Sequence, residues 1–276
     1  MKTMTSLYAR SASRAASLAL LVAGAAVVPS PAYAQIAVLT NTVEERIAGH
    51  GEGYRGSIVV LNTTGVEQRV RIYQTDYTFS ADGTSDFAEV GSLPRSNAAW
   101  VTPSAQMLVI PPNAQLPIAY TVRVPSDSGL SGTYWSTIMV EGTAGRAPAE
   151  RRGSVGLASV IRYAVQVATH IQASGSRKVQ FSSPLVGRDS SNHRSLELVL
   201  TNVGERGYRP VVWVELYDGK GELRGKVEQT RGLLYPGTSL KQTFVFADLP
   251  AGTYKAIVFA DTGDDAIFAT QHKLAF

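Results

Sequence analysis

The chain has 276 residues, of which 17% are charged and none is cysteine. The missing cysteines exclude a disulfide scaffold and any thiolate metal site. The formal net charge is +4, but Lys2, Arg10 and Arg14 lie in an N-terminal segment that we expect to be removed, so a nucleic-acid partner is not indicated.

Residues 1–34 have the pattern of a secretory signal peptide. Lys2, Arg10 and Arg14 precede an apolar stretch over 15–28, and Ala32-Tyr33-Ala34 forms a small-x-small cleavage site. An uncleaved membrane anchor is the alternative, but the stretch is shorter than the roughly 20 apolar residues that a span needs. The sequence therefore predicts export, with a mature chain that begins at Gln35 and contains no membrane span.

The remaining chain reads as short alternating strands separated by turn residues. In chain order, the first group of expected strands covers 36–47, 55–62, 67–77, 100–109, 116–124, 133–141 and 157–171. The second group covers 177–186, 194–201, 208–217, 222–229, 239–246, 252–260 and 266–275. About seven strands in about 100 residues are typical of an immunoglobulin-like sandwich. We therefore predict an all-β chain of two tandem immunoglobulin-like domains, 35–172 and 173–276, with a hinge near 172–177.

An internal repeat supports two similar halves. The segment 58–77 resembles 196–218, the segment 110–125 resembles 234–250, and the triplet Gly-Thr-Tyr opens a strand at both Gly132 and Gly252. The polar stretch 80–97 is the expected insertion in the first half. We expect both glycines to permit a tight turn before a central strand.

Motifs for catalysis are absent from the sequence. No G-x-S-x-G elbow, H-E-x-x-H pair, P-loop or dinucleotide fingerprint occurs, so we predict that the protein is not an enzyme and uses no metal or cofactor. Asn62-Thr63-Thr64 matches a glycosylation sequon, a match that is common by chance.

The expected strand 157–171 is long, and it follows a basic, glycine-rich loop over 142–156. One face of the strand carries Ile161, Tyr163, Val165, Val167 and Ile171, and the other carries Val160, Arg162, Ala164, Gln166 and Ala168. Such a strand is a candidate edge for pairing with a partner strand, and an ordinary final strand is the alternative.

The order of these features resembles the PapD-like periplasmic chaperones of pilus and fimbrial assembly. The resemblance is carried by "VIPPNAQLPIAYTVRVP", "GTYWSTIMVE", the loop that follows and the strand "VIRYAVQV". It implies a chaperone that binds exported pilin-like or surface subunits by strand donation, with an outer-membrane usher as a further candidate partner. It also implies client contacts by Val160, Ile161, Arg162, Tyr163, Val165 and Val167, and a client carboxylate held by the candidates Arg162 and Arg46.

A second interpretation remains open. Wall-binding domains of Gram-positive surface proteins share a similar layout, in which the sandwiches act as spacers. The alternative function is therefore a secreted cell-surface or cell-wall-binding adhesion module.

Overall fold

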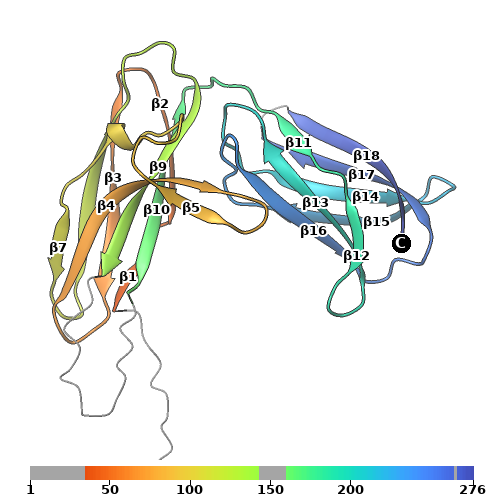
Figure 1. The fold of residues 1–276 in the computed structure, drawn as a ribbon, viewed down its shortest axis with the longest axis horizontal. Coiled ribbons are helices and arrows are strands. Elements are labelled where there is room, and N and C mark those ends of the chain that lie inside the picture. Colours follow the sequence, from red (N-terminus) through yellow and green to blue (C-terminus); the bar gives the residue numbers. More distant parts are fainter. Residues whose placement is uncertain (1–34, 143–159, 264–265) are drawn as a thin grey trace, which may run out of the picture. The chain divides into compact units, whose positions relative to one another are not determined.

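The computed structural model describes residues 35–142, 160–263 and 266–276, and these residues form two β-sandwiches (Figure 1). In the first sandwich, one sheet has the order β1 (Ile36–Val38), β3 (Gly53–Asn62), β8 (Gln115–Arg123), β6 (Val101–Pro103). The facing sheet has the order β2 (Val43–Ala48), β10 (Arg162–Ile171), β9 (Gly132–Gly142), β4 (Gln68–Phe79), β5 (Ser85–Ala88), and β7 (Met107–Ile110) also pairs with β4.

The second sandwich follows from residue 179 onward. Its first sheet contains β11 (Val179–Phe181), β12 (Leu185–Arg188), β13 (Arg194–Asn202) and β16 (Ser239–Phe246). Its second sheet has the order β15 (Leu223–Thr230), β14 (Val211–Tyr217), β17 (Thr253–Asp261), β18 (Ile267–Ala275). Among the described residues the only helical element is a 3₁₀ turn, η1 (Ala98–Trp100), so the predicted all-β, two-sandwich fold is confirmed.

Two sequence-based expectations concern residues outside the described ranges. These are the signal peptide over 1–34 and nearly all of the basic loop over 142–156. Within the described ranges, no helix has the length and apolar character that crossing a bilayer requires.

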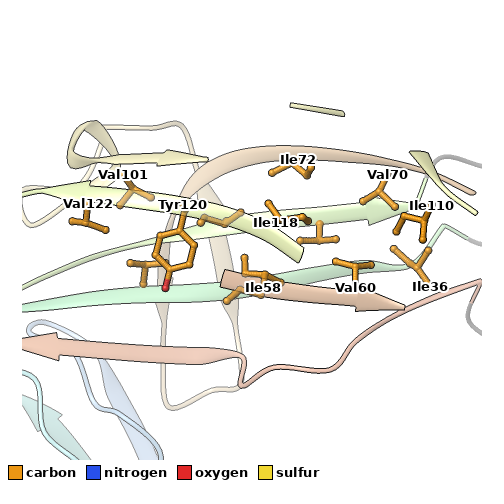
Figure 2. Packing of buried hydrophobic residues seen from close by; sticks show 14 residues of the cluster. Ile36, Ile58, Val60, Val70, Ile72, Val101, Ile110, Ile118, Tyr120 and Val122 are labelled. Carbon is orange, nitrogen blue, oxygen red and sulfur yellow. The ribbon is translucent and has the colours of Figure 1, made fainter. Parts of the chain in front are cut away.

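Each sandwich has its own apolar core, because alternate residues of its strands point inward. In the first core, Ile58 and Val60 of β3 meet Val70 and Ile72 of β4, and all four are almost fully buried. Figure 2 shows these side chains lying together with Ile118 and Tyr120 of β8. The second core is built in the same way around Leu196, Leu198, Val212, Val214 and Phe244.

The repeat seen in the sequence corresponds to a repeated set of hydrogen bonds, made by the amide of one buried asparagine in each sandwich. Asn62 Nδ2 donates to the carbonyls of Val66 (2.7 Å), Ile110 (3.1 Å) and Pro111 (2.9 Å). Asn202 Nδ2 donates to the carbonyls of Arg206 (2.8 Å) and Leu234 (3.0 Å). Each asparagine therefore joins the two segments that the sequence repeats, the end of one strand and the turn before another.

The two glycines that open the repeated Gly-Thr-Tyr triplets behave differently. Gly132 has φ +75°, as a turn that requires glycine would, whereas Gly252 is not among the residues with positive φ. The expectation for Gly252 was therefore wrong. A Cβ atom on residue 132 would lie 2.1 Å from the carbonyl oxygen of Glu205, so Gly132 also permits a close approach by the chain of the second sandwich.

Thr133 and Trp135, which follow Gly132, contact residues of the second sandwich. Thr133 N donates to Glu205 O (2.9 Å), and Gly207 N donates to Thr133 Oγ1 (2.8 Å). Trp135 stacks on Tyr235 with ring centroids 4.5 Å apart, while Tyr134 packs on Trp100 on the opposite face of β9, because consecutive strand residues point to opposite faces. Buried polar contacts and an aromatic stack thus connect residues on either side of the 172–177 segment.

Candidate functional site

Strand β10 has one fully paired side and one partly open side. It pairs with β9 along its whole length, from Arg162 to Ile171, but with β2 only from Gln166 to Ile171. No described strand lies beside residues 160–165 on the β2 side. Among the described residues, this half of β10 is therefore an open sheet edge, which is a template for pairing with another chain.

The direction of the peptide groups shows which residues of β10 present main-chain N–H and C=O groups at this edge. Gln166 N donates to Thr42 O (2.8 Å) on the β2 side, and Ile161 O accepts from Gly142 N (3.2 Å) on the β9 side. Because peptide groups alternate in direction along a strand, Arg162 and Ala164 direct their N–H and C=O groups to the open side. A partner strand would find these groups available.

The apolar residues predicted to contact a client divide into two sets. Val165 and Val167 are fully buried in the core of their own sandwich, and the half-buried Tyr163 donates its hydroxyl to Ile36 O (3.0 Å). Val160 is 47% exposed and Ile161 is half-buried. The side chains of Val165 and Val167 therefore fill this chain's core, and only the start of the predicted set is accessible.

Arg162 is already paired within the chain. Its Nε donates to Glu141 Oε2 (2.8 Å) on the neighbouring strand, and Tyr73 Oη donates to the same oxygen (2.8 Å). The hydrogen bond from Tyr73 and the guanidinium of Arg162 hold the pKa of Glu141 below its usual value, although partial burial raises it. Glu141 therefore occupies the position that a client carboxylate would need at Arg162.

Arg46 lies on β2, beside the end of β10 that is far from Arg162. In the β2–β10 ladder Arg46 is opposite Thr169, seven residues further along than Arg162. Seven residues of strand span about 23 Å. The structure does not bring the two candidate anchors together, so a single carboxylate cannot contact both.

Arg46 instead lines a basic pocket of about 440 Å³. The pocket is lined by residues from β2, the end of β10 and three segments of the second sandwich: Glu45, Arg46, Ile47, His170, Arg177, Arg206, Gly207, Tyr208, Arg209, Thr262 and Gly263. The sequence reasoning missed Arg177, Arg206 and Arg209. The cluster of arginines in the turn "GERGYRP" was the available signal.

Most cations of this basic pocket bind groups of the chain itself. Arg209 Nε donates to Glu45 Oε1 (2.8 Å), and Arg206, only 8% exposed, donates to the carbonyls of Gln172 (2.8 Å) and Ser174 (2.9 Å). Arg177 donates to Thr262 O (2.6 Å). Arg46 is exposed and forms no ion pair with a described residue. Consecutive strand residues point to opposite faces, so the Arg46 side chain lies on the face of Thr169 and Tyr54 and not beside Glu45.

Glu45 is held by two partners from different parts of the chain. His170 Nε2 lies 3.3 Å from Glu45 Oε2, and His170 Nδ1 lies 2.7 Å from Thr133 Oγ1. Burial raises the pKa of Glu45, but the hydrogen bonds from His170 and Arg209 outweigh this effect, so the pKa of Glu45 lies below its ordinary value. Ionised Glu45 thus ties β2 to Arg209 of the second sandwich.

The direction of this pKa shift predicts how stability depends on pH. A carboxyl group whose pKa is lowered by folding contributes stability above its unfolded pKa, and that contribution is lost as pH falls through the folded pKa. We expect Glu45→Gln to destabilise the protein by about 1 kcal/mol at pH 7, because it removes the ion pair with Arg209. The loss is no larger because Arg209 is partly exposed and solvent screens the pair. Urea unfolding at pH 7 and at pH 3 should show the difference between wild type and variant disappearing at the lower pH; a constant difference would contradict the assignment.

No protein-family profile and no curated protein matches the chain. Solved structures similar to it include the class 5 fimbriae chaperone CfaA, 12% identical, covering 86% of this chain and 98% of that chain with a TM-score of 0.47. The Pseudomonas aeruginosa CupB2 chaperone is 12% identical and covers 87% of this chain and 100% of that chain, with a TM-score of 0.38. A chain in the structure of the Salmonella enterica SafA pilin with the SafB chaperone is 12% identical. The match covers 87% of this chain and 96% of that chain, with a TM-score of 0.40.

Proposed function

We propose that the protein is a periplasmic chaperone that binds exported pilus, fimbrial or other surface-structure subunits through β-strand pairing at β10. The observation that carries this proposal is the open edge at Arg162 and Ala164, next to the exposed side chain of Val160. The signal-peptide pattern over 1–34 supports export.

In this mechanism the main chain supplies the affinity. A client strand that lies beside residues 160–165 would exchange hydrogen bonds with the N–H and C=O groups of Arg162 and Ala164. Such pairing is tolerant of sequence, because every peptide unit offers the same donor and acceptor. The edge therefore suits a chaperone whose clients differ in sequence, and an outer-membrane usher is a further partner under this proposal.

The proposal is tested by removing one donor from the open edge. Ala164→Pro deletes an N–H that faces away from β9, and proline is tolerated at such edge positions. We expect at least tenfold less subunit to co-purify with Ala164→Pro than with wild type when each is produced with the subunits of its own export cluster.

A matched variant is Ala269→Pro on β18, another edge strand. Ala269 is exposed and its N–H faces away from β17, since Thr262 N bonds Ala266 O and Gly252 pairs with Phe276 in that ladder. The Ala269→Pro variant should capture as much subunit as wild type. Equal capture by all three proteins would overturn the proposal, and no capture by wild type would favour the cell-surface or wall-binding module.

The exposed Arg46, which forms no ion pair with a described residue, gives a separate expectation about the client's terminal carboxylate. Arg46→Ala should weaken subunit binding about tenfold, because a charge-assisted hydrogen bond contributes roughly 1.5–3 kcal/mol. Arg162→Ala should weaken it less, since Glu141 neutralises Arg162. Dissociation constants measured by calorimetry for the two variants would decide; a larger loss with Arg162→Ala would return the anchoring role to that residue.

A further inference from the structure

A second pocket, of about 310 Å³, lies on the outward face of the sheet that contains β10. It is lined by Val43, Tyr77, Phe79, Ser80, Gly83, Thr84, Ser85, Gln166, Gly232 and Leu233. We call it the neutral pocket, because no lining residue carries a charge. Its volume is close to the lower limit for small-ligand pockets and is sufficient for one large side chain.

The walls of the neutral pocket combine apolar surface with hydrogen-bonding groups that bear no charge. Tyr77 and Phe79 present aromatic rings, and Val43 and Leu233 add aliphatic surface. Gln166 Oε1 accepts from Tyr235 Oη (2.7 Å), which fixes the amide, and Gln166 Nε2 donates to no described group. A charged side chain would lose its hydration here without gaining an opposite charge, so the pocket favours a bulky uncharged one.

The pocket is held in shape before any ligand arrives. Trp135 Nε1 donates to Tyr77 O (2.6 Å), Phe79 meets Tyr235 edge-on with centroids 6.3 Å apart, and Ala81 N donates to Ser239 Oγ (3.0 Å). These contacts fix the β4–β5 hairpin against the second sandwich. Because its walls are already ordered, binding in the pocket requires little ordering of the protein.

The pocket adjoins the open edge of β10. Gln166 is two residues beyond Ala164 on the same face of the strand, and Val43, the first residue of β2, is opposite Gln166. A client strand paired with Arg162 and Ala164 would end where β2 begins. The outward side chain of the client residue beside Ala164 would start about 8 Å from Gln166, and the small Ala164 leaves room for that side chain to lean across.

We propose that the neutral pocket receives a bulky uncharged side chain, aromatic or aliphatic, from the client strand that pairs with β10, and thereby selects the register of that strand. This inference rests on the proposed function. Main-chain pairing alone would allow a client strand to slip along the edge, whereas one side chain seated in a pocket specifies a single register.

The first experiment fills the pocket. Thr84→Trp places an indole at the pocket wall, and Thr102→Trp places one at an exposed position of β6, on the other sheet of the same sandwich. With subunits of the export cluster as the probe, Thr84→Trp should capture at least tenfold less subunit, and Thr102→Trp should capture as much as wild type. Both should melt at the wild-type temperature.

The outcomes separate this inference from the proposed function. If Ala164→Pro loses the subunit and Thr84→Trp retains it, the edge binds clients and the neutral pocket does not select them. If Ala164→Pro also retains the subunit, or wild type captures none, the proposed function fails and the inference fails with it.

The second experiment tests the chemical class of the side chain. In the captured subunit, each bulky uncharged residue of the pairing strand is replaced in turn by lysine. One replacement should weaken binding to wild type at least tenfold, and Gln166→Glu, which keeps an acceptor for Tyr235, should restore at least half of that loss in free energy. If Gln166→Glu rescues no lysine variant, the pocket does not contact the client strand.

Discussion

Replacing Gly132 by alanine is expected to lower the free energy of unfolding by about 4 kcal/mol or more. An alanine at φ +75° costs roughly 1–2 kcal/mol by itself. The added Cβ would also lie 2.1 Å from the carbonyl oxygen of Glu205, a backbone atom that accepts the hydrogen bond from Thr133 N. Relief of that contact requires the two sandwiches to separate locally, which breaks this bond and the buried one from Gly207 N to Thr133 Oγ1.

Gly252→Ala is the matched comparison, because Gly252 opens the same Gly-Thr-Tyr triplet in the second sandwich. A Cβ at this position would lie 3.4 Å from the nearest atom, on the Tyr254 side chain, an ordinary van der Waals distance. We expect a change below about 1 kcal/mol. Urea unfolding monitored by tryptophan fluorescence measures both values; similar losses for the two variants would contradict the account of Gly132.

Asn62→Ala is the second substitution with a large expected effect, about 3 kcal/mol of destabilisation. Asn62 is fully buried, and its amide supplies donors to three carbonyls and accepts from Thr64 N (2.9 Å). Truncation leaves those groups without their partner, and each unsatisfied buried group costs about 1–3 kcal/mol before water or relaxation offsets it. Asn202→Ala should have a similar but smaller effect, because its amide donates to two carbonyls.

Gln271→Ala on β18 is a suitable reference for these two variants, since it truncates an exposed amide. In thermal unfolding, the melting temperature of Gln271→Ala should lie within about two degrees of that of wild type. The melting temperatures of the two asparagine variants should lie well below it. If Asn62→Ala has the same melting temperature as Gln271→Ala, the hydrogen bonds of Asn62 contribute little to stability.

Most strands could be predicted from the sequence, because a period of two in apolar residues is a local signal. The expected strand 222–229 corresponds to β15 (Leu223–Thr230), and 252–260 corresponds to β17 (Thr253–Asp261). The expected strand 177–186 is divided into β11 and β12 around Pro184, which interrupts regular pairing. The expected strand 36–47 is also divided, because β1 pairs with β3 in one sheet and β2 pairs with β10 in the other.

The candidate site was harder to predict. Alternation shows that Tyr163, Val165 and Val167 share a face, but it does not show that this face is directed into the chain's own core. The basic pocket combines Arg46 with Arg177 and Arg209, which only the tertiary fold brings together. The neutral pocket depends on β5, which lies within the stretch 80–97 that alternation left as an insertion.

The buried position of Asn62 has a consequence for producing this protein. Asn62-Thr63-Thr64 is an acceptor sequence for N-linked glycans, and eukaryotic secretory pathways modify such sequences in exposed segments. A glycan on Asn62 cannot fit at a fully buried side chain, and it would occupy the nitrogen that binds three carbonyls. Material secreted from yeast or insect cells should therefore contain a glycosylated, misfolded fraction. Thr64→Val would remove it, with loss of the contacts of the Thr64 hydroxyl to Asn62 Oδ1 (2.8 Å), Gln68 Nε2 (3.1 Å) and the main chain of Val66.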